Sequence, residues 1–263
     1  MKNLFRSILI SMLLSVGILA QSTPSVQSII NQVNIDSLMK YVKELSGVNP
    51  VIINGQSVTI ASRHKNNAGN DQAANYLMQK LSSYGLTVTN QVFSSTGRNI
   101  YAVQSGTEFP NKKFMICGHY DSMPSGAIAP GADDNASGTA AVIEAARIFS
   151  NYSFPFTIIY ALWDEEEQGL IGSAYYANQA SSAGDSILGV INLDMIAWDS
   201  NNDGVANIHS RPTAGNSTQI KNKMVEVNSQ YGINLTLVIK SPGSTYSDHA
   251  SFWTKNYGAI LLI

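Results

Sequence analysis

The chain has 263 residues, of which 44% are hydrophobic and 13% are charged, and its formal net charge at pH 7 is −2. This length and apolar content suffice for one sizeable α/β domain with a buried core, but hardly for two. No cluster of lysine and arginine interleaves with aromatic residues, so the sequence lacks the electrostatic footprint of a nucleic-acid-binding protein and we expect no nucleic acid among its partners.

The first twenty residues differ from the rest of the chain. Lys2 and Arg6 precede an apolar run over residues 8–19, and polar sequence follows. This layout predicts a signal peptide over residues 1–20. The alternative, a membrane anchor, is disfavoured because an apolar run of about twelve residues is short for a bilayer span. We therefore expect a secreted or periplasmic protein without stable membrane association after cleavage, in which residues 21–263 form the domain.

The sequence contains a single cysteine, Cys117, so no intrachain disulfide is possible even after export. Cys117 lies among apolar residues, which is typical of a buried, inert thiol rather than of a nucleophile or a metal ligand. The stability of the domain must therefore come from its core.

Helix-like and strand-like segments alternate along the rest of the chain. Helical spacing of apolar residues predicts helices, the first two of which end at glycines, and short apolar or β-branched runs predict strands. The expected helices cover residues 28–47, 69–85, 137–151, 169–180 and 216–232. The expected strands cover residues 86–93, 99–106, 113–117, 156–163 and 187–195.

The last three of these strands are almost continuously apolar instead of alternating. Continuous apolarity indicates that both faces of a strand are covered, as in a mostly parallel sheet between two layers of helices. We therefore predict an α/β fold with a mostly parallel, mixed central sheet that helices flank on both faces.

Potential metal ligands follow each of these three strands. His119 and Asp121 follow the first strand, residues 164–167 (DEEE) follow the second, and Asp194 follows the third. A further pair, residues 133–134, precedes a helix. In open α/β sheets ligands bind outside the carboxyl ends of the strands, so we expect these side chains to share one crevice.

Each of these residues has an ordinary structural explanation when it is considered alone. A histidine at a strand end is commonly a hydrogen-bonded structural residue, an aspartate pair before a helix is commonly an N-cap, and a lone buried carboxylate can be held by backbone N–H groups. Several carboxylates in one crevice, however, repel one another unless a divalent cation neutralises them. A ligand set of histidine and carboxylates without thiolate favours Zn²⁺, with Mn²⁺ or Co²⁺ as alternatives.

Five ordered motifs resemble those of the M28 family of zinc aminopeptidases, which are co-catalytic dizinc exopeptidases. The motifs are GHYDS (118–122), PGADDNASG (130–138), EEEQGLIGS (165–173), NLDM (192–195) and SDHASF (247–252). The similarity runs from about Ser37 to the last residue. It implies a zinc-exopeptidase-like three-layer αβα fold, two zinc ions in the full-length chain and peptide substrates with a free N-terminus.

The resemblance also implies a first zinc site. His119, Asp133 and Asp194 match its ligands, and Asp133 matches the aspartate that bridges both metals and is joined to Asp134 by a cis peptide. Asp121 matches the carboxylate that orients the histidine.

The acidic run contains two further matches, because the sequence GLIGS directly after it fixes the register. Glu166 matches the general base, which takes a proton from the attacking water and passes it to the leaving amine. Glu167 matches a ligand of the second zinc. Asp164 and Glu165 are left over, and we expect ordinary roles for both.

The chain departs from the family pattern in two respects. The last ligand of the second zinc is a histidine that lies downstream of SDHASF in the family, in a segment of the type HTxxDT, and this sequence ends at Ile263. His249 corresponds to a structural histidine, so the second site lacks its histidine here. In addition, Ser244 occupies the position where some members carry a tyrosine that stabilises the tetrahedral intermediate, and Tyr246 could replace that tyrosine only if the loop differs.

The apolar, strand-like run at residues 258–263 has no turn or cap after it. We interpret the chain as incomplete at its C-terminus, and we expect a weakly active or inactive hydrolase whose full-length parent is active.

Three functions are compatible with these residues. The first is a secreted zinc aminopeptidase. The second is a carboxypeptidase or glutaminyl-cyclase-like enzyme on the same scaffold, and the third is a metal-free binding ectodomain. The presence of both Glu166 and Glu167 argues against the third, because a binding module has little reason to keep a costly cluster of carboxylates together.

Overall fold

The computed structural model describes residues 25–263, so the predicted signal peptide and the membrane-anchor alternative lie outside the described residues. Residues 32–263 form one compact unit, and the preceding segment is a separate unit that carries the short helix α2 (Val26–Ile30). None of the described helices is long and apolar enough to cross a membrane.

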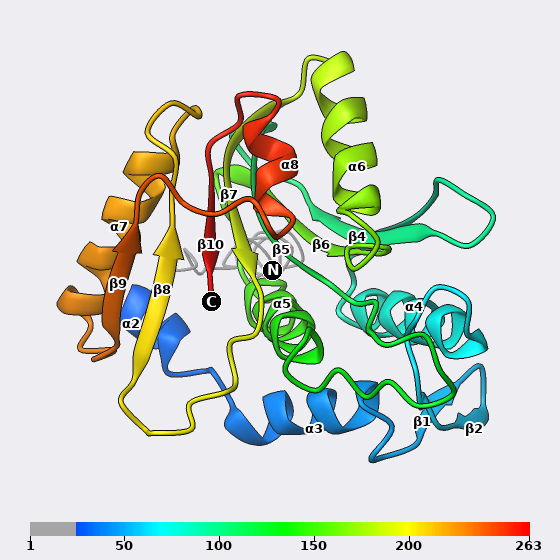
Figure 1. Cartoon of the computed structure of the whole chain (residues 1–263). Helices are drawn as coiled ribbons and strands as arrows, with labels where there is room; N and C mark the ends of the chain where they lie inside the picture. The colour runs from blue at the N-terminus through cyan, green and yellow to red at the C-terminus, as the bar shows by residue number, and fades with distance from the viewer. Residues whose placement is uncertain (1–24) are drawn as a thin grey trace, which may run out of the picture. The chain divides into compact units, whose positions relative to one another are not determined.

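An eight-stranded sheet forms the centre of the compact unit, in the order β3-β4-β6-β5-β7-β10-β8-β9 (Figure 1). β5 is parallel to both of its neighbours, β6 and β7, and the pairs β7–β10 and β8–β9 are also parallel, whereas the other pairs are antiparallel. The predicted mostly parallel, mixed sheet is therefore confirmed. The strands are β3 (Thr87–Val92), β4 (Arg98–Gln104), β5 (Phe109–His119), β6 (Phe156–Trp163), β7 (Ser186–Leu193), β8 (Val205–His209), β9 (Thr236–Lys240) and β10 (Ala259–Leu262).

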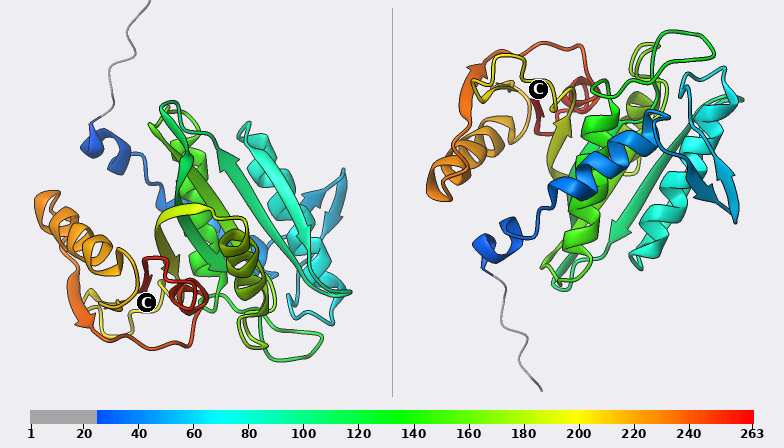
Figure 2. Two further views of the ribbon diagram at one scale, coloured as in Figure 1. Left: turned by 90° about the horizontal axis from the view of Figure 1, so that it is seen from above. Right: turned by 90° about the horizontal axis from the view of Figure 1, so that it is seen from below.

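Helices cover both faces of the sheet, as expected, so that the fold has three layers (Figures 1 and 2). On one face, α3 (Ile35–Leu45), α4 (Ala68–Ser83) and α5 (Ala136–Phe149) enclose a core that includes Leu77 and Ile143. On the other face, α6 (Ile171–Ser182) and α8 (His249–Trp253) pack around a second cluster that includes Trp163 and Phe252. Helix α7 (Ser217–Gln230) packs against β10, and a small hairpin joins β1 (Val51–Ile53) to β2 (Gln56–Val58).

The prediction of a single helix over residues 28–47 is wrong, because the structure has two helices there. Asn34 adopts an extended conformation, and its side chain accepts a hydrogen bond from the backbone N–H of Ser37. This N-cap starts α3 at Ile35 and separates it from α2. The strands β8 and β9 were not expected, because their residues are mostly half-buried or exposed and do not form a clear apolar run.

The three central strands β6, β5 and β7 bring the candidate ligands together at the carboxyl ends of the strands. Because these strands are parallel, their carboxyl ends lie side by side. β5 ends at His119, β6 ends one residue before Asp164, and β7 ends one residue before Asp194. The predicted convergence of strand ends is confirmed.

Candidate metal centre

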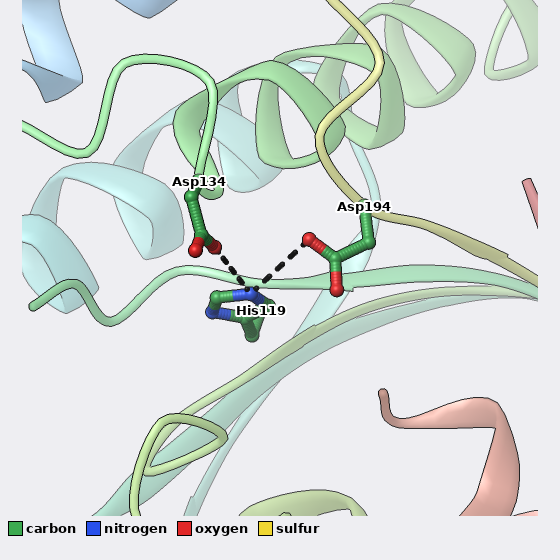
Figure 3. A group of neighbouring side chains, drawn as sticks. All are labelled: His119, Asp134 and Asp194. Carbon is green, nitrogen blue, oxygen red and sulfur yellow. Dashed lines mark ion pairs between the residues drawn. The ribbon is translucent and has the colours of Figure 1, made fainter. Parts of the chain in front are cut away.

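His119, Asp134 and Asp194 form a compact group that could hold a metal ion (Figure 3). The Nε2 atom of His119 lies 3.2 Å from Asp134 Oδ1 and 3.5 Å from Asp194 Oδ1. One ligand atom from each residue lies within 4.8 Å of the others. His119 and Asp194 are buried, whereas Asp134 is half-exposed and leaves the group open to solvent on one side.

Asp194 has one oxygen that is hydrogen-bonded and one that is not. Ser247 Oγ donates a hydrogen bond of 2.7 Å to Asp194 Oδ2, and Asn192 Nδ2 donates to Ser247 Oγ over the same distance. Asp194 Oδ1 is buried and has no hydrogen-bond partner. An unpaired buried carboxylate oxygen is costly, so a cation between Asp194 and His119 would satisfy an acceptor that the protein leaves open.

The charges around His119 and Asp194 shift both pKa values. Burial acts to lower the pKa of His119, but interactions with Asp121, Asp134 and Asp194 outweigh it and raise this pKa well above its usual range. Burial acts to raise the pKa of Asp194, but His119 and the hydroxyl of Ser247 outweigh it, and the net pKa is lowered. Without a metal, the interactions between His119 and the carboxylates around it therefore favour the charged forms of both.

Asp121 lies behind the histidine, at the position the resemblance implies. Its Oδ1 is 3.2 Å from His119 Nδ1, and its two oxygens accept hydrogen bonds from the backbone N–H groups of Glu166 and Glu167 at 3.1 and 3.2 Å. A proton on Nδ1 that is shared with Asp121 leaves the Nε2 lone pair free for a metal. Asp121 thus connects the histidine to the acidic run after β6.

The structure corrects the predicted register of the aspartate pair. Asp134, not Asp133, belongs to the group with His119, and the Oδ1 of Asp133 instead accepts a hydrogen bond of 2.9 Å from the backbone N–H of Ala197. The cis peptide joins Asp134 to Asn135, so its predicted place between Asp133 and Asp134 is also wrong.

The position of Asn135 explains this register. Asn135 is the N-cap of α5, because its Oδ1 accepts a hydrogen bond of 2.8 Å from the backbone N–H of Gly138. Its Nδ2 donates to the carbonyl of Leu193, the last residue of β7. Because both polar atoms of the Asn135 side chain are hydrogen-bonded, Asp134, the residue directly before it, lies next to His119. Sequence reasoning missed Asn135, although an asparagine before a helix is a recognisable capping signal.

The four acidic residues after β6 have different surroundings. Asp164 is fully buried and accepts hydrogen bonds from Asn70 Nδ2, the Tyr120 hydroxyl and the backbone N–H groups of residues 98 and 165. Glu165 turns toward the β3–β4 hairpin, where Thr96 Oγ1 donates to it at 2.6 Å and Lys65 Nζ lies 3.6 Å away. Both have structural partners outside the metal group, which is the ordinary role expected for them.

Glu166 lies next to the metal group, and the charges of that group act on both Glu166 and Glu167. Glu166 Oε2 lies 4.0 Å from His119 Nε2, and burial followed by the charge of Asp248 raises the pKa of Glu166 to about 9. Burial followed by the charge of Asp134 raises the pKa of Glu167 to about 7.

The other three histidines of the chain do not join the group. His249 Nε2 lies 2.9 Å from the carbonyl oxygen of Ser244, and burial lowers the pKa of His249 to about 4. His209 Nδ1 accepts a hydrogen bond of 2.9 Å from the backbone N–H of Ser244. His64 Nδ1 accepts a hydrogen bond from the backbone N–H of Asn66. Within residues 25–263 no second group of three ligands forms around Glu167.

An open pocket of about 430 Å³ adjoins the two glutamates. Glu166, Glu167, Gly169, Leu170, Thr245 and Tyr246 line this pocket. The side chain of Tyr246 is 89% exposed. The Ser244 hydroxyl lies 3.0 Å from His209 Nδ1, which places this side chain away from the pocket lining.

A sequence model of peptidase family M28 matches residues 99–262. The chain belongs to peptidase family M28. This match includes all six residues that the sequence analysis assigned to the site, as well as Asp134.

Similar proteins include peptidases of bacteria and fungi. The chain is 36% identical over 214 residues to leupeptin-inactivating enzyme 1 of Streptomyces exfoliatus, which covers 77% of this chain and 45% of that protein. It is 37% identical over 124 residues to a probable zinc metalloprotease of Pyrenophora tritici-repentis, covering 45% of this chain and 29% of that protein. The chain thus spans less than half the length of these curated relatives.

The solved structure of the LapA aminopeptidase of Legionella pneumophila has the same fold. It superposes with a TM-score of 0.76 at 19% sequence identity, over 90% of this chain and 62% of that chain. At this identity the likeness establishes the three-layer fold only.

Proposed function

We propose that this chain is a zinc-dependent exopeptidase of the aminopeptidase type. The observation that carries the proposal is the buried Oδ1 of Asp194, which has no hydrogen-bond partner within the geometric limits and lies 3.5 Å from His119 Nε2 in a group completed by Asp134. Histidine and carboxylate ligands without thiolate suit zinc, and relatives of this chain are described as probable zinc metalloproteases.

His119, Asp134 and Asp194 would hold the metal. When bound, zinc would act as a Lewis acid that polarises the scissile carbonyl and lowers the pKa of water. Asp121 Oδ1 lies 3.2 Å from His119 Nδ1 and would hold the imidazole proton there, which would leave the Nε2 lone pair for the metal. Ser247 holds Asp194 Oδ2 and leaves Oδ1 for the metal.

Glu166 is the proposed general base. It is buried, and its carboxylate lies next to the group without belonging to it. In this position it can take a proton from the attacking water and deliver it to the leaving amine. The pKa of about 9 applies to the protein without metal, and a cation beside Glu166 would lower it toward neutrality, which suits a residue that both accepts and donates a proton.

Asp134 and Glu167 are the proposed protein ligands of a second zinc ion. A further ligand is needed for a closed site, and residues 25–263 do not place a histidine there. We therefore propose that this chain binds one zinc ion tightly and a second weakly, and that its turnover is low unless zinc is in excess.

The acidity of the pocket favours substrates with a free N-terminus. With a cation bound beside them, Glu166 and Glu167 would be ionised at the pocket wall, where they would attract the ammonium group of a peptide N-terminus and repel the carboxylate of a C-terminus. This complementarity supports an aminopeptidase over a carboxypeptidase. We further propose that residues 1–20 direct export, so that the enzyme acts outside the cytoplasm.

Aminoacyl-p-nitroanilides test this proposal directly. We expect slow hydrolysis at saturating zinc, loss of hydrolysis with a chelator and recovery when zinc is added back. N-acetylated versions of the same substrates serve as the control and should not be cleaved. If cleavage at saturating zinc is absent or insensitive to chelator, the proposal is wrong. Sequencing of the N-terminus of protein exported from a cell tests cleavage after residue 20.

A further inference from the structure

Arg63 is a fully buried arginine beside the metal group. Its guanidinium donates four hydrogen bonds, all of them to backbone carbonyl oxygens and none to a carboxylate. The acceptors are the carbonyls of Leu45, Tyr120, Pro130 and Gly131. Removing the charged side chain of an arginine from water costs free energy, and these four hydrogen bonds offset part of that cost.

The four acceptors belong to the two segments that carry His119 and Asp134, and to the end of α3. Tyr120 stands between His119 and Asp121, and Gly131 lies three residues before Asp134. The Nη2–Gly131 and Nη1–Pro130 bonds are both 2.8 Å long. One planar guanidinium therefore joins the end of β5 to the turn that leads into α5.

The backbone around Arg63 reinforces this connection. The N–H of Arg63 donates to Ser122 Oγ at 3.0 Å, and Ser122 Oγ donates to the carbonyl of Ala129 at 2.9 Å. The N–H of Ala129 in turn donates to the carbonyl of Ala61 at 2.9 Å. The loop between Asp121 and Asp134 is thus anchored along its length by the segment that contains Arg63.

Gly131 lies in a position where a side chain would not fit. Its φ is +42°, and a Cβ atom at this position would lie 2.9 Å from Arg63 Nη2 and 2.2 Å from the carbonyl oxygen of Asp134. The carbonyl of Gly131 also accepts the N–H of Ala136 in the first turn of α5. Gly131 therefore links Arg63 to the start of α5, and it packs closely against the backbone of Asp134.

The charge of Arg63 acts on the same site. Burial lowers the pKa of Arg63 to about 10, while Asp121, Asp134 and Glu167 oppose this change, so the side chain remains protonated at neutral pH. The hydrogen bonds of Arg63 go to neutral carbonyls, so Arg63 does not occupy a carboxylate oxygen that could bind a metal. Its positive charge can still reduce the repulsion among these carboxylates.

We propose that Arg63 is a positioning residue that sets the spacing between His119 and Asp134 by hydrogen-bonding the backbone of both ligand segments. This role rests on the proposed function, since it concerns the same metal group. Lysine keeps the charge but cannot reproduce a planar fork that reaches four carbonyls. Replacement by lysine therefore separates the geometry of Arg63 from its charge.

The first test uses the protein without metal. Amide hydrogen exchange in the presence of chelator is compared for the unsubstituted chain and Arg63→Lys, with Arg147→Lys as a matched control. Arg147 is half-buried and pairs with Glu144, but like Arg63 it donates to a backbone carbonyl, and it lies in the last turn of α5, away from the site. We expect exchange at the N–H groups of Ala129 and Ala136 to rise severalfold in Arg63→Lys only.

The second test is zinc affinity, measured by competition with a chromophoric chelator. We expect Arg63→Lys to bind zinc about tenfold more weakly, with no such change in Arg147→Lys. If Arg63→Lys does not fold, Arg63→Gln, which is smaller and uncharged, is measured instead. Folded Arg63 variants with unchanged exchange at Ala129 and Ala136 would overturn the proposal, and the exchange experiment gives this answer whether or not the chain binds zinc. Failure of the unsubstituted chain to bind zinc would instead count against the proposed function.

Discussion

Ser247 Oγ donates a hydrogen bond of 2.7 Å to Asp194 Oδ2, and this bond leaves Asp194 Oδ1 as the carboxylate oxygen beside His119. The serine is itself held by Asn192 on β7. A side chain on the segment before α8 thus orients a ligand at the end of a central strand.

Removal of this hydrogen bond should weaken the metal site without unfolding the protein. We predict that Ser247→Ala lowers zinc affinity by about tenfold, because Asp194 can then rotate away from His119. The measurement is chelator-competition titration. Ser251→Ala is the control, since Ser251 is also buried and lies in α8, but it pairs with Ser173 and not with a ligand. Equal zinc affinity in both variants would contradict the orienting role of Ser247.

The register of the aspartate pair can be tested by two single substitutions. We predict that Asp134→Asn abolishes tight zinc binding, because it removes a charged ligand, whereas Asp133→Asn retains it. Asp133 Oδ1 accepts a hydrogen bond from the backbone N–H of Ala197, so its replacement should cost about 1 kcal/mol of stability at most. Calorimetric zinc titration measures the first effect and urea unfolding the second. If Asp133→Asn loses tight zinc binding and Asp134→Asn retains it, Asp133 is the ligand, as the sequence predicted.

Substitutions of the two glutamates should distinguish a loss of catalysis from a loss of metal binding. We predict that Glu166→Gln retains tight zinc but loses turnover by a factor of about 10² to 10⁴, as expected for a general base. Glu167→Gln should instead weaken the second metal site and raise the zinc concentration needed for half-maximal activity. Hydrolysis rates across a zinc titration measure both effects. A Glu166→Gln enzyme with normal turnover would exclude Glu166 as the base.

The acidity of the site predicts a pH dependence of stability in the metal-free protein. Burial is the largest cause that raises the pKa of Glu166 to about 9 and the pKa values of Asp164, Glu167 and Asp248 to about 7. Unfolded carboxyl groups have pKa values of about 4. The stabilising contribution of each group is therefore complete below about pH 4 and is lost as the pH rises through 7 toward 9.

Thermal unfolding in chelator should show this loss. We expect the Tm to fall between about pH 5 and about pH 9, and to fall less when zinc keeps the carboxylates ionised. Glu166→Gln should flatten the dependence, because it removes the group with the highest of these four pKa values. A metal-free protein with a higher Tm at the alkaline end would contradict the electrostatics described for the site.

The sequence was sufficient to predict the fold and most of the site, because each apolar central strand is followed directly by its ligand. His119 and Asp194 each follow such a run, and parallel pairing brings their strand ends together. Asp133 and Asp134 could not be separated in this way, because they are identical neighbours. Their register depends on the hydrogen bonds of Asn135 to α5 and β7, which are tertiary contacts.

Arg63 and Ser247 were missed for a related reason. A polar residue shows no periodic signal when its role is to reach a backbone carbonyl or a ligand carboxylate in a distant segment. Arg63 lies 57 residues before Tyr120, and Ser247 lies 53 residues after Asp194. Their burial follows from the packing of the whole domain and is not visible in local sequence.

The central claim is that His119, Asp134 and Asp194 bind zinc, and calorimetric zinc titration of the 263-residue chain tests it most directly. We predict one tight site, which is lost in His119→Ala and in Asp134→Asn. Two tight sites would contradict the absence of a closed second site. No tight site, or a site that survives both substitutions, would contradict the metal centre itself.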